Sequence, residues 1–361
     1  MTEAPSAPGA PLRNRARPTR EPACYAALDL GTNNCRLLIA TPQGTGFRVV
    51  EAYSRIVRLG EGLAHSGRLA EPAMERALAA LKVSAEKVRR RKVVRLRAIA
   101  TQACRIAENG ADFIQRVTKE TGLRLQIITP QEEAKLSVAG CVTLLDRSYE
   151  AALVVDVGGG STEISWLDLK AAPEADSPPM RAWLSIPIGV VTLAERFPEG
   201  ETATESWFRA MVDAVKTEIA GFRRADGLRP VFGADRAHLI GTSGAITSLA
   251  GMHLDLPRYD RNRVDGIWMT RGECDQATNR LLALKTHERA AQPCIGPDRA
   301  DLVLAGAAIL QAVQELWPCS RVRVADRGLR EGILISLINQ RGGRRRRRRG
   351  RSGRTLAASA A

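Results

Sequence analysis

The stretch L-V-V-D-V-G-G-G-S-T-E-I, residues 153–164, indicates a strand, a tight turn and a second strand, and we predict that the fold is organised around it. The β-branched run 153–155 is typical of a buried strand, and Asp156 stands where that strand meets the glycines 158–160. Because glycine lacks a Cβ, such a turn can point successive N–H groups into one concavity that holds phosphate oxygens. Ser161 adds a hydroxyl donor. An ordinary glycine hairpin without a ligand is the alternative.

An earlier stretch, Y-A-A-L-D-L-G-T-N-N-C-R-L-L-I-A at residues 25–40, repeats this pattern. It contains an apolar strand, Asp29, a glycine turn with hydroxyl and amide side chains, and a second apolar strand. The separation of Asp29 and Asp156 along the chain suits two similar domains that present their turns to a shared cleft. A carboxylate beside a phosphate site is favourable chiefly when a hard cation such as Mg²⁺ lies between them. The pair of turns therefore predicts a metal-assisted phosphate site.

Two further stretches offer candidate site residues. H-L-I-G-T-S-G-A-I-T, residues 238–247, predicts a strand that runs through a glycine turn into a helix, which makes a third anion loop. T-P-Q-E-E-A-K-L, from Thr129, has the proline and the acidic pair that favour a helix start. Complementation of the helix dipole alone accounts for Glu132 and Glu133. The paired turns supply a second reason, because hydrolysis at a phosphate requires a nearby base.

The order of the predicted elements indicates an α/β protein in two halves. We predict a disordered tail at 1–22, a first domain at 23–145, a second domain at 146–326, a C-terminal helix at 327–340 that packs on the first domain, and a disordered tail at 341–361. Strands are expected near 24–30, 35–40, 47–52, 93–100 and 125–128, and helices near 71–91, 113–121 and 203–223. If the segment after residue 100 is helical, Thr101, Arg105 and Asn109 share one face of it.

The net charge of +15 lies mostly in the two tails. Residues 341–354 hold nine arginines and no acid, and residues 1–22 hold four arginines against two glutamates. The arginine-rich tail predicts electrostatic binding of RNA or another polyanion, and a solvated tail without a dedicated partner is the alternative. The seven cysteines are scattered and form no C-x-x-C pair, which argues against disulfides or a zinc site. The sequence contains no signal-peptide pattern and no long apolar run, so we expect a cytoplasmic protein without a membrane span.

Taken together, these motifs resemble the exopolyphosphatase and guanosine pentaphosphate phosphohydrolase (Ppx/GppA) family of the actin, Hsp70 and sugar-kinase superfold, over about residues 24–340. D-L-G-T-N-N-C-R-L is similar to the first phosphate motif of the family, and D-V-G-G-G-S-T-E to the second. Q-E-E-A-K-L resembles a family segment whose second glutamate is the catalytic base. A-T-Q-A-C-R, I-G-T-S-G-A-I-T and D-R-G-L-R-E-G resemble the arginine segment, the later glycine loop and the C-terminal signature.

The resemblance implies two RNase H-like domains with an interdomain cleft, a phosphoanhydride hydrolase and a homodimer. It places the base on Glu133, and we assign Glu163 and Arg105 to the catalytic group, and Asp29 and Asp156 to Mg²⁺, with Mn²⁺ as a substitute. We assign phosphate binding to Gly31, Thr32, Asn33, Arg36, Gly158, Gly159, Gly160, Ser161, Thr242, Ser243 and Gly244. Thr32, Asn34 and Pro130 depart from the residues usual in the family, and we expect these changes to tune turnover.

Three classes of function remain open on the sequence: a phosphoanhydride hydrolase with either of two substrates, a kinase or ATPase, and a binding regulator. Inorganic polyphosphate and guanosine pentaphosphate end in the same anhydride, so exopolyphosphatase activity and pentaphosphate phosphohydrolase activity are both consistent with the motifs. A kinase or ATPase of the same superfold is a rival, although no adenosine site is recognisable and Glu133 favours attack by water. A regulator that binds polyphosphate or an alarmone with little turnover is the third, and the complete acidic set argues against it.

Overall fold

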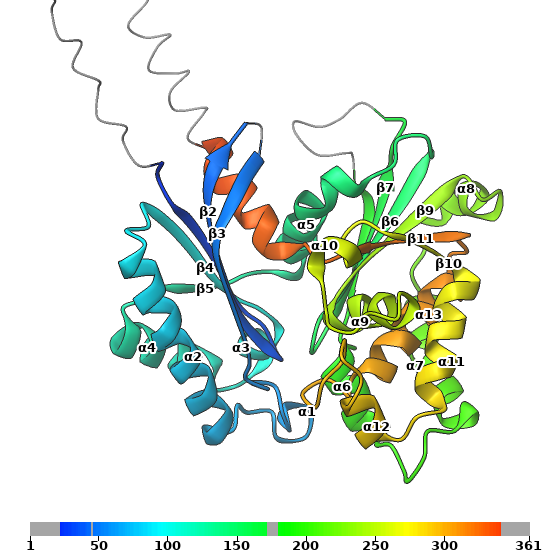
Figure 1. The fold of residues 1–361 in the computed structure, drawn as a ribbon, viewed down its shortest axis with the longest axis horizontal. Helices are drawn as coiled ribbons and strands as arrows, with labels where there is room; N and C mark the ends of the chain where they lie inside the picture. The colour runs from blue at the N-terminus through cyan, green and yellow to red at the C-terminus, as the bar shows by residue number, and fades with distance from the viewer. Residues whose placement is uncertain (1–21, 45, 172–179, 341–361) are drawn as a thin grey trace, which may run out of the picture.

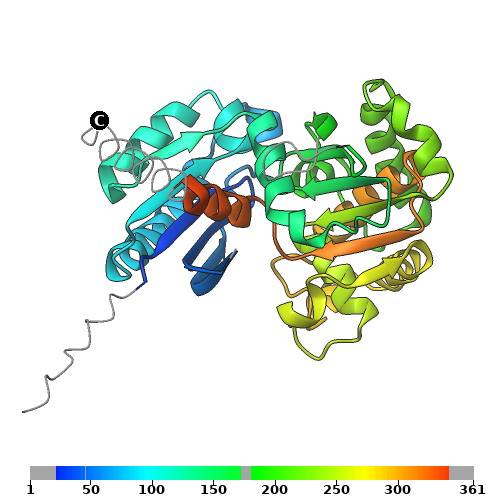
Figure 2. The same cartoon turned by 90° about the horizontal axis from the view of Figure 1, so that it is seen from above.

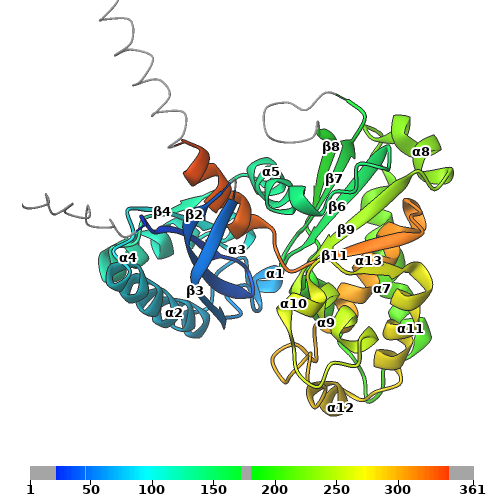
Figure 3. The same cartoon turned by 45° about the horizontal axis from the view of Figure 1, so that its top comes forward.

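The computed structural model describes residues 22–44, 46–171 and 180–340 of the chain. These residues form two α/β domains that lie side by side, each built on its own sheet (Figures 1 and 3). Except for residue 22, the two tails predicted to be disordered lie outside the described residues, and so does the arginine run proposed to bind polyanions.

The first sheet contains five strands: β1 (Tyr25–Leu30), β2 (Asn34–Gln43), β3 (Gly46–Ile56), β4 (Arg95–Ala100) and β5 (Leu125–Ile127). Their order across the sheet is β3-β2-β1-β4-β5. The first three strands form an antiparallel meander, and β4 and β5 follow in parallel with β1. The tight connection between β1 and β2 is the glycine turn that follows Asp29.

Four helices accompany this sheet: α1 (Leu63–Ser66), α2 (Glu71–Arg90), α3 (Gln102–Ile106) and α4 (Gly110–Thr121). Helix α2 has a proline in its first turn and buries Ala77 and Leu81, one helical turn apart, in the same apolar cluster as Leu28 of β1 and Phe113 of α4. Gly122 ends α4 in the left-handed region, at φ 73°. This apolar cluster fixes one face of the first sheet.

The second sheet contains six strands: β6 (Ala151–Val157), β7 (Thr162–Asp168), β8 (Met180–Ile186), β9 (Ala237–Thr242), β10 (Trp268–Thr270) and β11 (Arg321–Ala325). Their order is β10-β11-β9-β6-β7-β8. An antiparallel meander, β6 to β8, is again followed by two strands parallel to its first member, β9 and β11. The chain therefore repeats one topology twice, which confirms the predicted pair of RNase H-like domains of the actin superfold.

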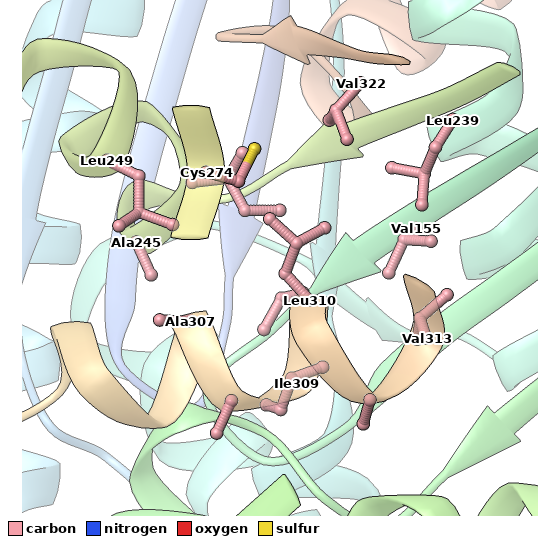
Figure 4. Packing of buried hydrophobic residues seen from close by; sticks show 14 of the residues in the cluster. Val155, Leu239, Ala245, Leu249, Cys274, Ala307, Ile309, Leu310, Val313 and Val322 are labelled. Atoms are coloured by element: carbon pink, nitrogen blue, oxygen red, sulfur yellow. The ribbon is translucent and has the colours of Figure 1, made fainter. Parts of the chain in front are cut away.

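The helices around the second sheet are α6 (Val190–Arg196), α7 (Glu205–Ala220), α8 (Arg229–Gly233), α9 (Gly244–His253), α10 (Arg261–Val264), α11 (Arg271–Leu282), α12 (Thr286–Ala290) and α13 (Val303–Leu316). Short 3₁₀ turns lie at Val142–Leu144 and Asp226–Leu228. Figure 4 shows Leu310 and Val313 of α13 on the side of the helix that faces the sheet residues Val155 and Leu239. These four side chains are fully or almost fully buried. They anchor β6, whose carboxyl end leads into the glycine turn.

Two crossing helices join the domains: α5 (Pro130–Cys141) and the C-terminal helix, residues 329–340. The C-terminal helix returns from β11 and packs on the first sheet, where Ile333 and Leu334 share an apolar cluster with Leu136 of α5 (Figure 2). A Cβ on Gly140 would lie 1.9 Å from the carbonyl oxygen of Gly328, and one on Gly332 would lie 1.9 Å from that of Leu136. Glycine is therefore required at both places, because the helix backbones touch there.

The segment after β4 differs from the helical prediction. Helix α3 ends at Ile106, and Ala107 is extended, so Asn109 does not continue the face that carries Arg105. The side chain of Asn109 instead accepts from the N–H of Leu69 and donates to its carbonyl. In the part of the chain that the structure describes, no helix is long and apolar enough to cross a bilayer.

Candidate active site

The glycine turns of both domains meet at one cavity of about 340 Å³. We call residues 31–33 the first loop, residues 158–161 the second loop and residues 242–244 the third loop. The predicted site residues that line this cavity are Asp29, Gly31, Thr32, Asn33, Arg36, Glu133, Asp156, Gly158, Gly159, Gly160, Ser161, Glu163, Thr242, Ser243 and Gly244. Arg105 does not line it and lies behind Glu133.

The first and second loops are in direct contact across the domain boundary. A Cβ on Gly159 would lie 2.9 Å from the backbone nitrogen of Asn33, and one on Gly160 would lie 2.8 Å from Oγ1 of Thr32. Side chains at these two positions would push the loops apart, so the approach itself requires glycine. Among the described residues, the N–H groups of Thr32, Asn33, Gly159 and Gly160 have no backbone or side-chain acceptor. Such a group of free donors suits an anion.

Asp29 and Asp156 occupy equivalent places in the two domains, in the first strand of each meander, next to the turn. Burial raises the pKa of Asp29 to about 6, and the Arg36 guanidinium opposes part of that rise. Burial also raises the pKa of Asp156, whose Oδ2 accepts a short hydrogen bond from the hydroxyl of Ser137. Oδ1 of Asp29 is buried and has no hydrogen-bond partner among the residues that the structure describes. Because a buried oxygen without a hydrogen bond is unfavourable, a bound ligand would stabilise the site at this atom.

The donor set around these aspartates fits a hard divalent cation that keeps much of its own hydration. Within the described ranges, no group of three or more histidine, cysteine, aspartate or glutamate side chains could hold a metal ion alone. Mg²⁺ is usually held by one or two carboxylates together with water and substrate phosphates. Asp29 and Asp156, with the free Oδ1 of Asp29, therefore match what Mg²⁺ requires and do not match a site built entirely from protein ligands.

Glu133 lies in the first turn of α5 and is only 7% exposed. Arg105 donates to its Oε2 over 3.1 Å, and the same guanidinium donates to the carbonyl of Ile128 and to Oε1 of Gln102. Burial, followed by the charge of Glu163, raises the pKa of Glu133 well above its ordinary value, and Arg105 opposes this rise. A buried carboxylate with a raised pKa, beside a cavity, is typical of a general base.

Glu163 faces the same region from β7 and is almost fully buried. Its Oε1 accepts from the hydroxyl of Ser185 over 2.8 Å. Burial, and then the charge of Asp156, raises the pKa of Glu163 to about 7. Four carboxyl groups at the cavity therefore have raised pKa values: Asp29, Asp156, Glu133 and Glu163. A bound cation would favour their charged forms.

The third loop completes the cavity at the N-terminus of α9. The side chain of Ser243 caps this helix by accepting from the N–H of Ile246 over 3.0 Å. The hydroxyl of Thr242 donates to the carbonyl of Arg327, which ties the third loop to the segment that leads into the C-terminal helix. The amide donors at the start of α9 and its positive dipole end favour an anion at this side of the cavity.

Several residues that line the cavity had no role assigned from the sequence. They are Tyr259, Arg261, Arg299, Asp326, Arg330 and Glu331. Within the described residues, the guanidinium groups of Arg36, Arg299 and Arg330 form neither an ion pair nor a hydrogen bond, so their charge is available to an anionic ligand. Arg330 and Glu331 belong to the motif D-R-G-L-R-E-G, whose signal was visible, whereas Tyr259 and Arg261 follow no turn or strand pattern that singles them out.

The chain is similar to proteins of one phosphatase family along most of its length. A model described as the Ppx/GppA phosphatase family matches residues 38–341. Exopolyphosphatase 2 of Mycobacterium tuberculosis is 30% identical over 328 residues, which cover 86% of this chain and 98% of that protein.

Two solved structures are similar to this chain along most of its length. The crystal structure of the Aquifex aeolicus member of the Ppx/GppA family aligns with a TM-score of 0.71 at 28% identity, covering 88% of this chain and 98% of that one. An exopolyphosphatase from Cytophaga hutchinsonii aligns with a TM-score of 0.77 at 24% identity, covering 88% of this chain and 98% of that one. At this identity the similarity supports the fold alone.

Proposed function

Because the chain belongs to the Ppx/GppA phosphatase family, we propose that it is a metal-dependent exopolyphosphatase, which releases the terminal phosphoryl group of inorganic polyphosphate as phosphate. One observation carries this proposal. Glu133, a buried carboxylate with a raised pKa, lies at a cavity lined by two touching glycine loops, whose N–H groups have no acceptor in the described part of the chain. Hydrolysis of an anhydride needs this combination of a base for water and donors for the phosphoryl oxygens.

In the proposed mechanism, the first and second loops bind the oxygens of the terminal phosphoryl group. Glu133 accepts a proton from the attacking water, and Arg105 holds the Glu133 carboxylate in place through its 3.1 Å hydrogen bond. Glu163 supports the orientation of that water from β7. Asp29 and Asp156 are the residues that would hold Mg²⁺, which when bound neutralises phosphate charge. Arg36 adds a fixed positive charge beside Asp29.

The lining of the cavity favours a chain of phosphates over a nucleotide. In the lining that the described residues provide, Arg36, Arg299 and Arg330 supply positive charge without an ion-pair partner, and Tyr259 is the single aromatic residue. Its hydroxyl already donates to Asp326 over 2.8 Å. A purine base is usually held by stacking and by hydrogen bonds to its edge, and no second aromatic side chain is present here to stack on it. Guanosine pentaphosphate is the alternative substrate, because its terminal anhydride is the same.

The proposal is tested by phosphate-release kinetics with Mg²⁺ on long polyphosphate, short polyphosphate, guanosine pentaphosphate and ATP. We expect the largest kcat/KM on polyphosphate. A preference for guanosine pentaphosphate would replace the proposed substrate by the alternative, and a preference for ATP would favour the kinase or ATPase class. Tight binding of polyphosphate without release of phosphate would favour the regulator.

The pH dependence of turnover should report the electrostatic role of Arg105. Glu133 acts as a base only when it is deprotonated, so kcat/KM rises with pH until the pKa of Glu133 is passed. Arg105 lowers that pKa. Arg105→Gln removes the charge and should shift the acid limb of the pH profile to higher pH by about 1 unit or more. Arg105→Lys keeps the charge and is the control. If the acid limb of the pH profile of Arg105→Gln stays in place or moves to lower pH, Arg105 does not lower the pKa of Glu133.

A further inference from the structure

Residues 57–62, which we call the strap, connect the two phosphate-binding loops to each other through the domain boundary. The strap follows β3 in the first domain, and its backbone is bonded directly to the first loop. The N–H of Val57 donates to the carbonyl of Asn33 over 2.8 Å, and the N–H of Gly60 donates to that of Thr32 over 2.9 Å. A Cβ on Gly60 would lie 2.2 Å from Cγ2 of Thr32. The strap and the first loop therefore move as one piece.

The strap also contacts the second domain at two points. The guanidinium of Arg58 donates to both carboxylate oxygens of Asp301, over 3.0 and 3.2 Å. The N–H of Gly62 donates to Oε1 of Glu195 in α6 over 2.9 Å. The first turn of α6 is also hydrogen-bonded to the second loop, because the N–H of Val191 donates to the carbonyl of Gly159 over 2.8 Å. A continuous set of hydrogen bonds thus runs from the first loop through the strap to the second loop.

Arg58 is held in a backbone conformation that its residue type seldom adopts. Its φ is 46°, in the left-handed region, and its N–H donates to the carbonyl of Asn33 over 3.1 Å. The guanidinium of Arg76 in α2 bonds the carbonyl of Val57 over 2.9 Å and fixes the strap on the first domain. A strained residue that carries the ion pair between domains is consistent with a functional use of that pair.

The two sides of the domain boundary are built differently. On one side, α5 and the C-terminal helix touch backbone to backbone at Gly140 and Gly332. On the strap side, a cavity of about 390 Å³ lies between the domains, lined in part by Arg58, Glu195 and Asp301. The side of α5 and the C-terminal helix is closely packed, whereas the strap side is joined by polar contacts beside a cavity. A change in the separation of the domains therefore breaks fewer packing contacts on the strap side.

We propose that the strap sets the separation of the first and second loops and that Arg58 is a positioning residue, whose ion pair with Asp301 favours the arrangement in which both loops bind one phosphoryl group. The proposal rests on the proposed function for its substrate. Arg58 does not line the cavity of the active site, so it acts through the loops. Its side chain is 34% exposed and that of Asp301 is 42% exposed, and pairs of this kind contribute little to folding stability. Loss of the pair should therefore change substrate binding far more than the unfolding midpoint.

The test compares Arg58→Ala, Asp301→Ala and the exchanged pair Arg58→Asp with Asp301→Arg. Aspartate tolerates the left-handed region, so it suits position 58. We expect each single substitution to raise KM for long polyphosphate about threefold to tenfold, because a smaller fraction of molecules is competent to bind. The exchanged pair should restore KM, and salt near 0.5 M should reduce the difference between the variants and the parent chain, because it screens the exposed pair. Arg236→Ala, which breaks the exposed Arg236–Glu150 pair inside the second domain, is the matched control.

A second readout does not depend on turnover. Fluorescence energy transfer between dyes at the exposed positions 86 in α2 and 218 in α7, during titration with inorganic polyphosphate, reports the separation of the domains. Arg58→Ala should shift the midpoint of that titration to higher concentration, in parallel with KM. Equal midpoints for Arg58→Ala and Arg236→Ala, or failure of the exchanged pair to restore the midpoint, would overturn the role of the strap. Absence of phosphate release from the parent chain would count against the proposed function and would leave this readout intact.

Discussion

Glu133→Gln should lower kcat on polyphosphate by about 10²- to 10⁴-fold, which is the usual contribution of a general base. The substitution keeps the size of the side chain and a group that Arg105 can still contact, but it removes the ability to accept a proton from water. KM should change much less, because the loops and the arginines that bind phosphate are untouched. The measurement is phosphate release under saturating polyphosphate, with circular dichroism to confirm that the fold is retained.

The adjacent residue supplies the matched control for that experiment. Glu132 lies in the same turn of α5, but it pairs with Arg97 and does not line the cavity. Glu132→Gln should therefore keep turnover close to that of the parent chain. Near-normal turnover of Glu133→Gln, or equal losses for both variants, would remove Glu133 from the role of base.

Gly332→Ala should lower the free energy of unfolding by about 1–3 kcal/mol or more, because it overpacks a closed contact. The new Cβ would lie 1.9 Å from the carbonyl oxygen of Leu136, and backbone at the crossing of two helices cannot move aside as a flexible side chain would. The same shift of α5 should misplace Glu133, so turnover is expected to fall as well. Urea unfolding and phosphate release measure the two effects.

Gly272→Ala is the control for the crossing. Gly272 lies in the first turn of α11, and nothing lies within 4 Å of a Cβ built there. Alanine is favoured over glycine in a helix by up to about 1 kcal/mol, so this variant should be as stable as the parent chain or more so. An unfolding midpoint for Gly332→Ala equal to that of Gly272→Ala would show that the two helix backbones are not in contact there.

The fold and the loops were predictable because their signals are local. An apolar run, an aspartate and a glycine turn occur twice, and each stretch lies within about 16 residues. The structure shows the same meander and the same position of the aspartate in both domains. The start of α5 was equally visible, since Pro130 follows the capping residue Thr129. The catalytic and metal-binding roles of the residues gathered there stay predictions, as do a homodimer and a cytoplasmic location.

The rest of the site depends on contacts between distant segments. Arg330 reaches the cavity because the C-terminal helix crosses from the second domain to the first. The sequence predicted that helix and its packing, but no local pattern placed the Arg330 side chain at the cavity. The ion pair of Arg58 with Asp301 joins residues that are far apart in the chain, and both are ordinary surface residue types. Asn109 shows the reverse case. A regular four-residue spacing would put it on the helix face of Arg105 if the segment were helical, but the extended backbone at Ala107 ends the helix first.

The C-terminal helix also determines when the first domain can be completed during translation. The face of the first sheet that carries Leu38 and Ile99 is covered by residues of this helix, which follow the whole second domain in the chain. Until then the nascent chain presents an apolar surface that other chains can bind. The core of the first domain is therefore completed only after the second domain has been synthesised.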